Sequence, residues 1–190
     1  MTKSRLEAFG DAVLAIVFTI MVLEFHVPRG TTLASLLPLA PKFLSYVLSF
    51  VFLAIYWNNH HHLFQSVQRV NGAVLWANIH LLFWLSLVPF ATAWLGESHL
   101  APLPVALYGL VLILAALAYY VLVRALVSLH GPASPIAVAI GKDFKGKTSL
   151  ALYAVGLGLS PFVPVASVGI YVLVAIVWLV PDPRFEREGL

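Results

Sequence analysis

The stretch NGAVLWANIHLLFWLSLVPFATAWL, from Asn71 to Leu95, contains no formally charged residue. A membrane-spanning helix needs roughly 20 mainly apolar residues, because a rise of about 1.5 Å per residue has to cover a hydrocarbon core of about 30 Å. Between Arg69 and Arg124 the only charged residue is Glu97, so a second such stretch follows directly. These residues predict two transmembrane helices in the middle of the chain.

The rest of the chain has the same composition. Of its 190 residues, 61% are apolar and 10% are charged, whereas about a quarter of the residues in soluble domains are charged. Twelve prolines and the absence of regular alternation are unlike the strands of a membrane β-barrel, and helices satisfy every backbone polar group in lipid. We therefore predict an all-α, polytopic membrane protein with six transmembrane helices in one domain, residues 1–190. The approximate spans are 6–27, 43–68, 71–95, 103–128, 148–162 and 165–180. The last two are short for a full crossing, so we expect either that flanking residues complete the crossing or that these helices insert incompletely.

Lysine and arginine residues determine the predicted orientation, because cytoplasmic loops carry an excess of both. With six spans, one side of the membrane holds nine of the eleven basic residues: Lys3, Arg5, Arg69, Arg124, Lys142, Lys145, Lys147, Arg184 and Arg187. The other side holds Arg29 and Lys42, so both termini are predicted to be cytoplasmic. The segment with Lys142, Lys145 and Lys147 could also bind anionic lipid, although a topological role is favoured.

Several classes of function find no support in the residues. The chain has no cysteine, its serines lack a neighbouring base, and it has no glycine-rich phosphate-binding loop, so we do not expect an enzyme or a bound cofactor. The basic residues lie at the ends of segments and form no stripe among aromatic residues, so we do not expect a nucleic-acid partner.

The first apolar segment combines an aliphatic stripe with a hydroxyl group. At about 100° per residue, one helix face carries Ile16, Thr19, Ile20 and Leu23. Arg5 and Phe9 extend this stripe toward the start of the segment.

Asp11 points to another face, where it has to meet a neighbouring helix or water. Spacing alone does not identify a pore, because aliphatic residues of membrane helices commonly face lipid or core, and threonines often bond back to their own backbone.

The run RLEAFGD, from Arg5 to Asp11, resembles the R-x-x-x-F-S-D first-helix signature of the bacterial transmembrane-protein-175 family of potassium channels. Three further stretches are similar to the ends of that family's second, third and sixth helices: residues 57–64 (WNNHHHLF), 88–97 (VPFATAWLGE) and 178–185 (WLVPDPRF). The resemblance thus extends over almost the whole chain in order. One departure is Gly10, which stands where the family has a serine.

The resemblance implies a six-helix subunit, of which four copies surround a pore lined by the first helix, in the plasma membrane of a prokaryote. By position, Ile16, Ile20 and Leu23 match the family's hydrophobic constriction, and Thr19 matches the hydroxyl layer tied to ion preference. The signature packing network is implied to comprise Arg5, Phe9, Asp11, Trp57, Asn58, His61, His62 and His80.

The function predicted on these grounds is a potassium-permeable cation channel of modest potassium selectivity, with potassium ions and membrane lipid as partners. No T-V-G-Y-G sequence occurs, so selectivity has to come from pore size and hydroxyl groups rather than from a carbonyl-lined filter.

The alternative is a proton- or metal-linked secondary transporter that uses His60, His61 and His62, with help from Glu24, His26 or His80. Three consecutive histidines on a helix point about 100° apart. A structural, hydrogen-bonded histidine cluster is therefore favoured over a metal site.

Overall fold

The computed structural model describes residues 2–141 and 143–179, and in these ranges all regular elements are helical. The elements are α1 (Lys3–Leu23), the 3₁₀ helix η1 (Leu33–Leu39), α2 (Ala40–Gln65), α3 (Gly72–Ser86), α4 (Val88–Glu97), α5 (Pro102–His130), α6 (Pro135–Ile140), α7 (Phe144–Leu159) and α8 (Pro164–Leu179). Lys142, Val180, Arg184 and Arg187, which entered the predictions above, lie outside the described residues.

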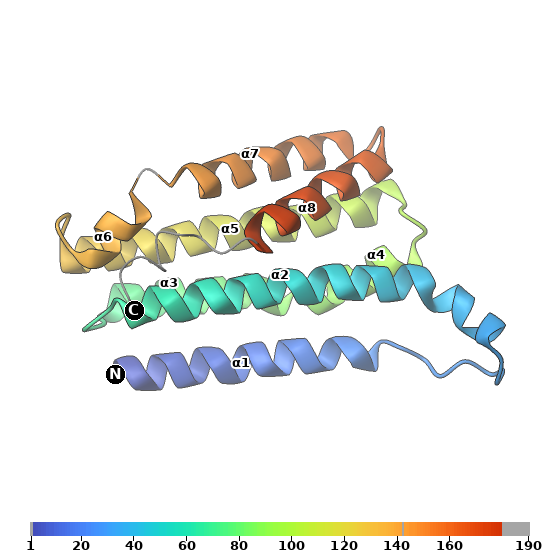
Figure 1. Ribbon diagram of the computed structural model, residues 1–190, viewed down its shortest axis with the longest axis horizontal. Helices are drawn as coiled ribbons and strands as arrows, with labels where there is room; N and C mark the ends of the chain where they lie inside the picture. The colour runs from blue at the N-terminus through green and yellow to red at the C-terminus, as the bar shows by residue number, and fades with distance from the viewer. Residues whose placement is uncertain (1, 142, 180–190) are drawn as a thin grey trace.

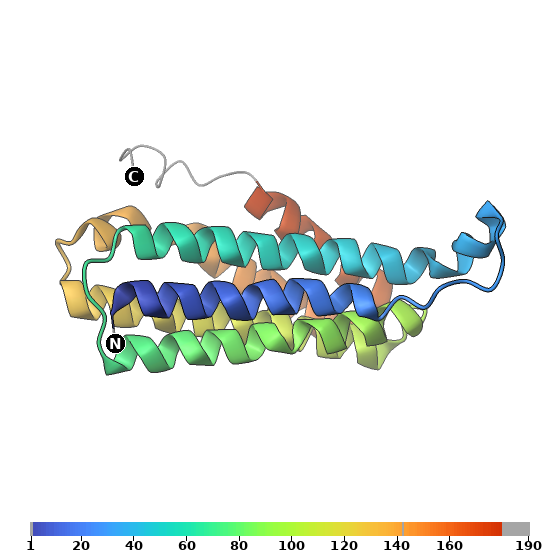
Figure 2. The ribbon, with the colours of Figure 1, turned by 90° about the horizontal axis from the view of Figure 1, so that it is seen from below.

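The long helices run side by side along the longest axis of the molecule (Figures 1 and 2). The first helix, α1, lies along one edge, where it packs on α2, α3 and α4. The α7–α8 hairpin covers the other edge and packs on α5. The centre of the core therefore lies between α2, α3, α4 and α5, and α1 contributes one buried face to it from the edge.

The third predicted span is not one continuous helix. α3 ends at Ser86 and α4 begins at Val88, with Leu87 as the residue between them. Pro89 has no backbone N–H with which to continue the hydrogen-bond ladder, and its ring crowds the preceding turn. The prediction of an unbroken helix over 71–95 overlooked this effect.

The loops hold more helix than predicted. The segment before α2 forms η1, and the linker between α5 and α7 contains the short helix α6. The side chain of Ser134 accepts a hydrogen bond from the backbone N–H of Ala137, so it caps α6, and Pro135 follows in the first turn, where its missing N–H costs nothing. α1 has nearly the predicted length, but it begins and ends three to four residues earlier than the predicted span 6–27.

Four stretches are long and apolar enough to cross a membrane: Lys3–Leu23, Leu33–Gln65, Gly72–Glu97 and Pro102–His130. α7 and α8 have 16 residues each, which corresponds to about 24 Å of helix. That is less than the roughly 30 Å of a hydrocarbon core, so these two helices need flanking residues to complete a crossing.

Tyr171 of α8 joins the hairpin to the core. Its side chain is fully buried, and it fits against two glycines, Gly109 of α5 and Gly156 of α7. A Cβ atom built on Gly156 would lie 2.5 Å from Cε1 of the tyrosine ring, and one built on Gly109 would overlap its hydroxyl group. The two glycines therefore allow three helices to approach one another around a single aromatic ring.

Candidate functional site

The predicted pore-lining stripe of α1 is left uncovered by the subunit itself. Ile16 is 59% exposed, Ile20 is 39% exposed and Leu23 is 75% exposed, and Thr19 between them is exposed as well. The face of α1 that packs on the other helices carries Leu6, Gly10, Leu14, Val17 and Met21. Exposure of an aliphatic stripe to water costs free energy. The exposed stripe of Ile16, Ile20 and Leu23 is therefore suited to contact lipid or further copies of the chain.

Thr19 presents only part of its hydrogen-bonding capacity to the outside. Its hydroxyl group lies 3.0 Å from the carbonyl oxygens of Ala15 and Ile16 and donates to them. The single hydroxyl proton is thus directed at the helix backbone, and the lone pairs of the oxygen remain. A hydroxyl oxygen in this state can accept from water or contact a cation.

Four residues of the predicted signature network make contacts within or between α1 and α2. The indole Nε1 of Trp57 on α2 donates to the Asp11 carboxylate on α1 at 3.1 Å, and the Trp57 ring stacks on that of His61 at 6.0 Å. His61 and His62 both contact the side chain of Gln65. These contacts attach the first half of α1 to the second half of α2.

The remaining members of the predicted network lie elsewhere. Arg5, Phe9 and Asn58 are exposed, and His80 accepts a hydrogen bond from Trp84 on its own helix at 2.9 Å. In the part of the chain that the structure describes, these four side chains therefore do not join the Asp11–Trp57 contact. Arg5 and Phe9 share the outward stripe of Ile16, so they point away from α2 and α3.

The buried member of the histidine run is His60, which the predicted network did not include. It is 3% exposed, and its Nε2 lies 2.7 Å from Oδ1 of Asn78 on α3. The ring also packs against Phe64 and beside the backbone of Gly10, where a Cβ atom would lie 3.4 Å from its Cε1. One hydrogen-bonded pair thus joins α2 to α3 beneath α1.

The three histidine side chains consequently do not converge on one point. His60 faces the core, whereas His61 and His62 contact Gln65 on their own helix. Within the described ranges, no group of three histidine, cysteine, aspartate or glutamate side chains is placed to hold a metal ion. His60 is the member of the run whose hydrogen bond joins two helices.

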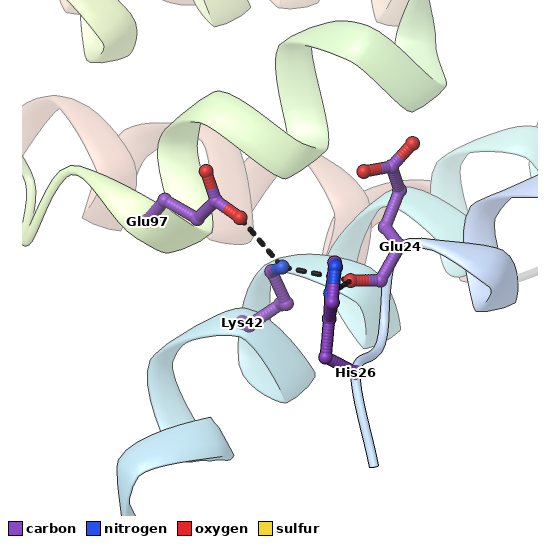
Figure 3. A network of polar contacts seen from close by, with 4 residues as sticks. All are labelled: Glu24, His26, Lys42 and Glu97. Carbon is purple, nitrogen blue, oxygen red and sulfur yellow. Dashed lines mark hydrogen bonds and ion pairs between the residues drawn. The ribbon is translucent and has the colours of Figure 1, made fainter. Parts of the chain in front are cut away.

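A second polar contact lies at the other end of α1 (Figure 3). The ammonium group of Lys42, at the start of α2, donates to the Glu97 carboxylate at 2.7 Å and to the backbone carbonyl of Glu24 at 2.8 Å. Nδ1 of His26 lies 3.2 Å from the same carbonyl oxygen. Lys42 therefore satisfies a carbonyl at the end of α1, which no longer has a helical partner, and connects it to α2 and α4.

Close approach of the backbones makes this contact possible. A Cβ atom at Gly96 would lie 2.8 Å from the Cα atom of Lys42, so only glycine lets α4 approach α2 so closely. Deeper in the bundle, the hydroxyl of Thr92 donates to that of Ser49 at 2.6 Å, and Ser49 lies 2.9 Å from the hydroxyl of Tyr108. Buried hydroxyl groups thus join α2, α4 and α5.

Comparison with known proteins places this helical arrangement in a family. A potassium channel of a Chryseobacterium species (strain P1-3) is 54% identical to the chain over 188 residues, which cover 99% of this chain and 98% of the relative. The chain belongs to the TMEM175 family. The family model described as the endosomal/lysosomal potassium channel TMEM175 matches residues 5–89.

Two further relatives of the TMEM175 family extend the comparison. The crystal structure of a lysosomal potassium-selective channel TMEM175 homolog from Chamaesiphon minutus matches with a TM-score of 0.82 at 31% identity, covering 94% of this chain and 96% of that one. A human protein named endosomal/lysosomal proton channel TMEM175 is 33% identical over 103 residues, which are 48% of this chain and 20% of the human one.

These relationships confirm the predicted family and the all-α class of a multi-pass membrane protein. TMEM175 proteins are ion channels rather than enzymes, in agreement with the prediction made from the residues. They also favour a channel over the alternative of a secondary transporter.

Proposed function

We propose that four copies of the chain form a potassium-permeable channel in which the α1 helices line a central pore. The observation that carries this proposal is the uncovered stripe of α1, because its aliphatic side chains face away from the core of their own subunit. The relatives from Chryseobacterium and Chamaesiphon are named potassium channels, which supports potassium as the permeating ion.

In such an assembly, the constriction consists of Ile16, Ile20 and Leu23 from each subunit. A narrow apolar neck resists ions because water leaves it easily, and a small change in its width opens or closes it. The hydroxyl oxygens of four Thr19 residues lie within this neck and offer the lone pairs described above. The sequence contains no T-V-G-Y-G motif, which forms the carbonyl-lined filter of other potassium channels, so selectivity for potassium over sodium is modest.

We propose six crossings with both termini on the cytoplasmic side; the bacterial relative supports a prokaryotic plasma membrane, and the placement of the basic residues supports the orientation. The start of α1, the α2–α3 connection, the end of α5 and the start of α7 lie at one end of the molecule (Figure 1). Lys3, Arg69, Arg124 and Lys147 belong to these segments, whereas Lys42 belongs to the opposite end. An excess of basic residues is typical of the cytoplasmic side.

Proton permeation is a second candidate, because the human TMEM175 relative is named a proton channel. The apolar, hydroxyl-containing neck described above admits water only when it is open, so protons and potassium ions would share one gate. A measurement of which ion sets the reversal potential distinguishes potassium permeation from proton permeation.

The test is the current through the purified chain in a planar bilayer, with potassium on one side and sodium on the other at equal pH. We expect discrete openings with a reversal potential displaced toward that of potassium. A proton gradient imposed at equal potassium should displace the reversal potential only slightly. A reversal potential that follows the proton gradient would replace potassium with protons as the permeant ion, and electrical silence of folded, inserted protein would contradict the channel proposal.

A further inference from the structure

A cavity of about 290 Å³ lies between α2, α5 and α7, away from the exposed stripe of α1. Its walls are mainly apolar and aromatic, with Tyr56 from α2, Leu117 and Tyr120 from α5, Tyr153 from α7 and Trp178 from α8. This volume is close to the lower limit of ordinary small-molecule sites, which measure about 300–1,000 Å³. The pore stripe contributes no residue to it, so the cavity is separate from the proposed conduction pathway.

The cavity opens on its α5 side. Leu117 is 39% exposed and Tyr120 is 43% exposed, although both line the cavity. They lie in the middle of α5, a 29-residue helix that is long enough to cross the bilayer. The opening therefore faces the hydrocarbon region of the membrane.

The end of the cavity at the start of α7 is polar. Asn59, Asp143, Gly146 and Lys147 line it there. The Asp143 carboxylate accepts a hydrogen bond from the backbone N–H of Gly146 at 3.2 Å and so caps α7. The cavity thus has an apolar body at membrane depth and a polar end near the boundary of the membrane.

Basic side chains gather at this end in the part of the chain that the structure describes. The ammonium group of Lys145 lies 4.6 Å from the centre of the Trp178 ring in the cavity wall. Lys147 is exposed and makes no ion pair with the residues that the structure describes. Arg124 follows Tyr120 by one turn of α5, which puts it on the same face. Among the residues that the structure describes, Lys147 and Arg124 are both exposed at this end and Asp143 is the one acidic residue there, and the positive end of the α7 dipole adds to the positive charge.

We propose that this cavity binds an anionic phospholipid, with one acyl chain between α2, α5 and α7 and the headgroup beside Lys147. An acyl chain matches the apolar, laterally open body of the cavity, and an anionic headgroup matches its cationic end. The lipid therefore belongs to the leaflet that faces the first turn of α7. This assigns the basic segment a ligand in addition to its effect on topology.

The experiment uses the full chain in phosphatidylcholine vesicles that contain a small fraction of phosphatidylglycerol with a photoreactive diazirine on its acyl chain. After illumination, cross-linked peptides are located by mass spectrometry. We expect labelling concentrated on residues 116–123 and 146–153, suppressed by excess unlabelled phosphatidylglycerol and much less by excess phosphatidylcholine. Labelling spread evenly over all helices, or equal suppression by the two lipids, would overturn the proposal.

Two variants sharpen the test. Lys147→Gln should reduce the preference for phosphatidylglycerol about fivefold, because one lysine near a charged membrane surface contributes on that order. Lys3→Gln is the matched control, since Lys3 lies at the same end of the molecule but pairs with Glu7 on α1, and it should leave the preference unchanged. An equal effect of both variants would show general surface attraction and contradict a site at the cavity. The competition between unlabelled lipids needs no variant and decides the question if a variant fails to fold.

Discussion

The Ile16→Asn channel is expected to pass severalfold larger unitary currents than the native channel and to discriminate less between potassium and sodium. In the proposed tetramer, one substitution puts four amide groups at the same level of the apolar neck, where they hold water and lower the barrier to ion entry. Ile16 is 59% exposed within its subunit, so the fold should change in stability by no more than about 0.5 kcal/mol. Unitary conductance and reversal potential in planar bilayers measure both effects.

Val22→Asn provides the matched control for this prediction. Val22 lies on the same helix, is 50% exposed and points about 120° away from Ile16. Its conductance and selectivity should equal those of the native channel. If the two variants changed the current equally, or if Ile16→Asn changed nothing, the stripe would not line the pore.

Gly156→Ala is expected to have the largest effect on stability. The added methyl group would lie 2.5 Å from Cε1 of Tyr171, whose ring is fully buried and is held on another side by Gly109. Overpacking of this kind costs about 1–3 kcal/mol, and the better helix propensity of alanine offsets about 1 kcal/mol of it, so we expect a net loss of up to about 2 kcal/mol. Such a loss lowers the melting temperature by up to about 8 °C, which tryptophan fluorescence of the solubilised protein can follow.

Gly158→Ala is the control for the glycine substitution. It lies in the same helix, but a Cβ atom there would meet nothing within 4 Å. The variant should be as stable as the native protein or more stable by up to about 1 kcal/mol. Equal melting temperatures for the two alanine variants would mean that Tyr171 is not confined as the structure shows.

The membrane class and the helical fold could be predicted from the sequence because they depend on composition along the chain. The uncharged stretch from Asn71 to Leu95 requires a helix in lipid, whatever its neighbours are. The break at Leu87 could also have been predicted, since Pro89 removes a hydrogen bond wherever it stands inside a helix. The short helices η1 and α6 left no comparable signal, as they have too few residues for a hydrophobic period.

The polar contacts between helices were harder to predict, because they depend on which faces meet. Helical spacing did contain a signal for His60, which lies seven residues after the buried Leu53 and four before the buried Phe64. This helical spacing of three to four residues predicts that His60, rather than His61 or His62, lies in the core. Its partner on α3, Asn78, could not be identified without knowing how α2 and α3 are aligned.

The contact between Lys42, Glu97 and the carbonyl of Glu24 could not be predicted from the sequence at all. The three groups are separated by 18 and 55 positions along the sequence. Each residue was noted in the sequence for a different reason, and nothing there indicated that they meet. The close approach at Gly96 that allows the contact is a property of the packed backbones. A single sequence contains no measure of that distance.

The central claim, that the stripe of α1 lines the pore, is tested most directly by cysteine accessibility, because the native chain contains no cysteine. Ile20→Cys and Val22→Cys place one thiol each on faces of α1 about 160° apart. A cationic, thiol-reactive reagent is applied while the current is recorded. We expect progressive, irreversible loss of current in Ile20→Cys and no change in Val22→Cys. Modification of Val22→Cys alone, or equal modification of both, would contradict a pore lined by this stripe.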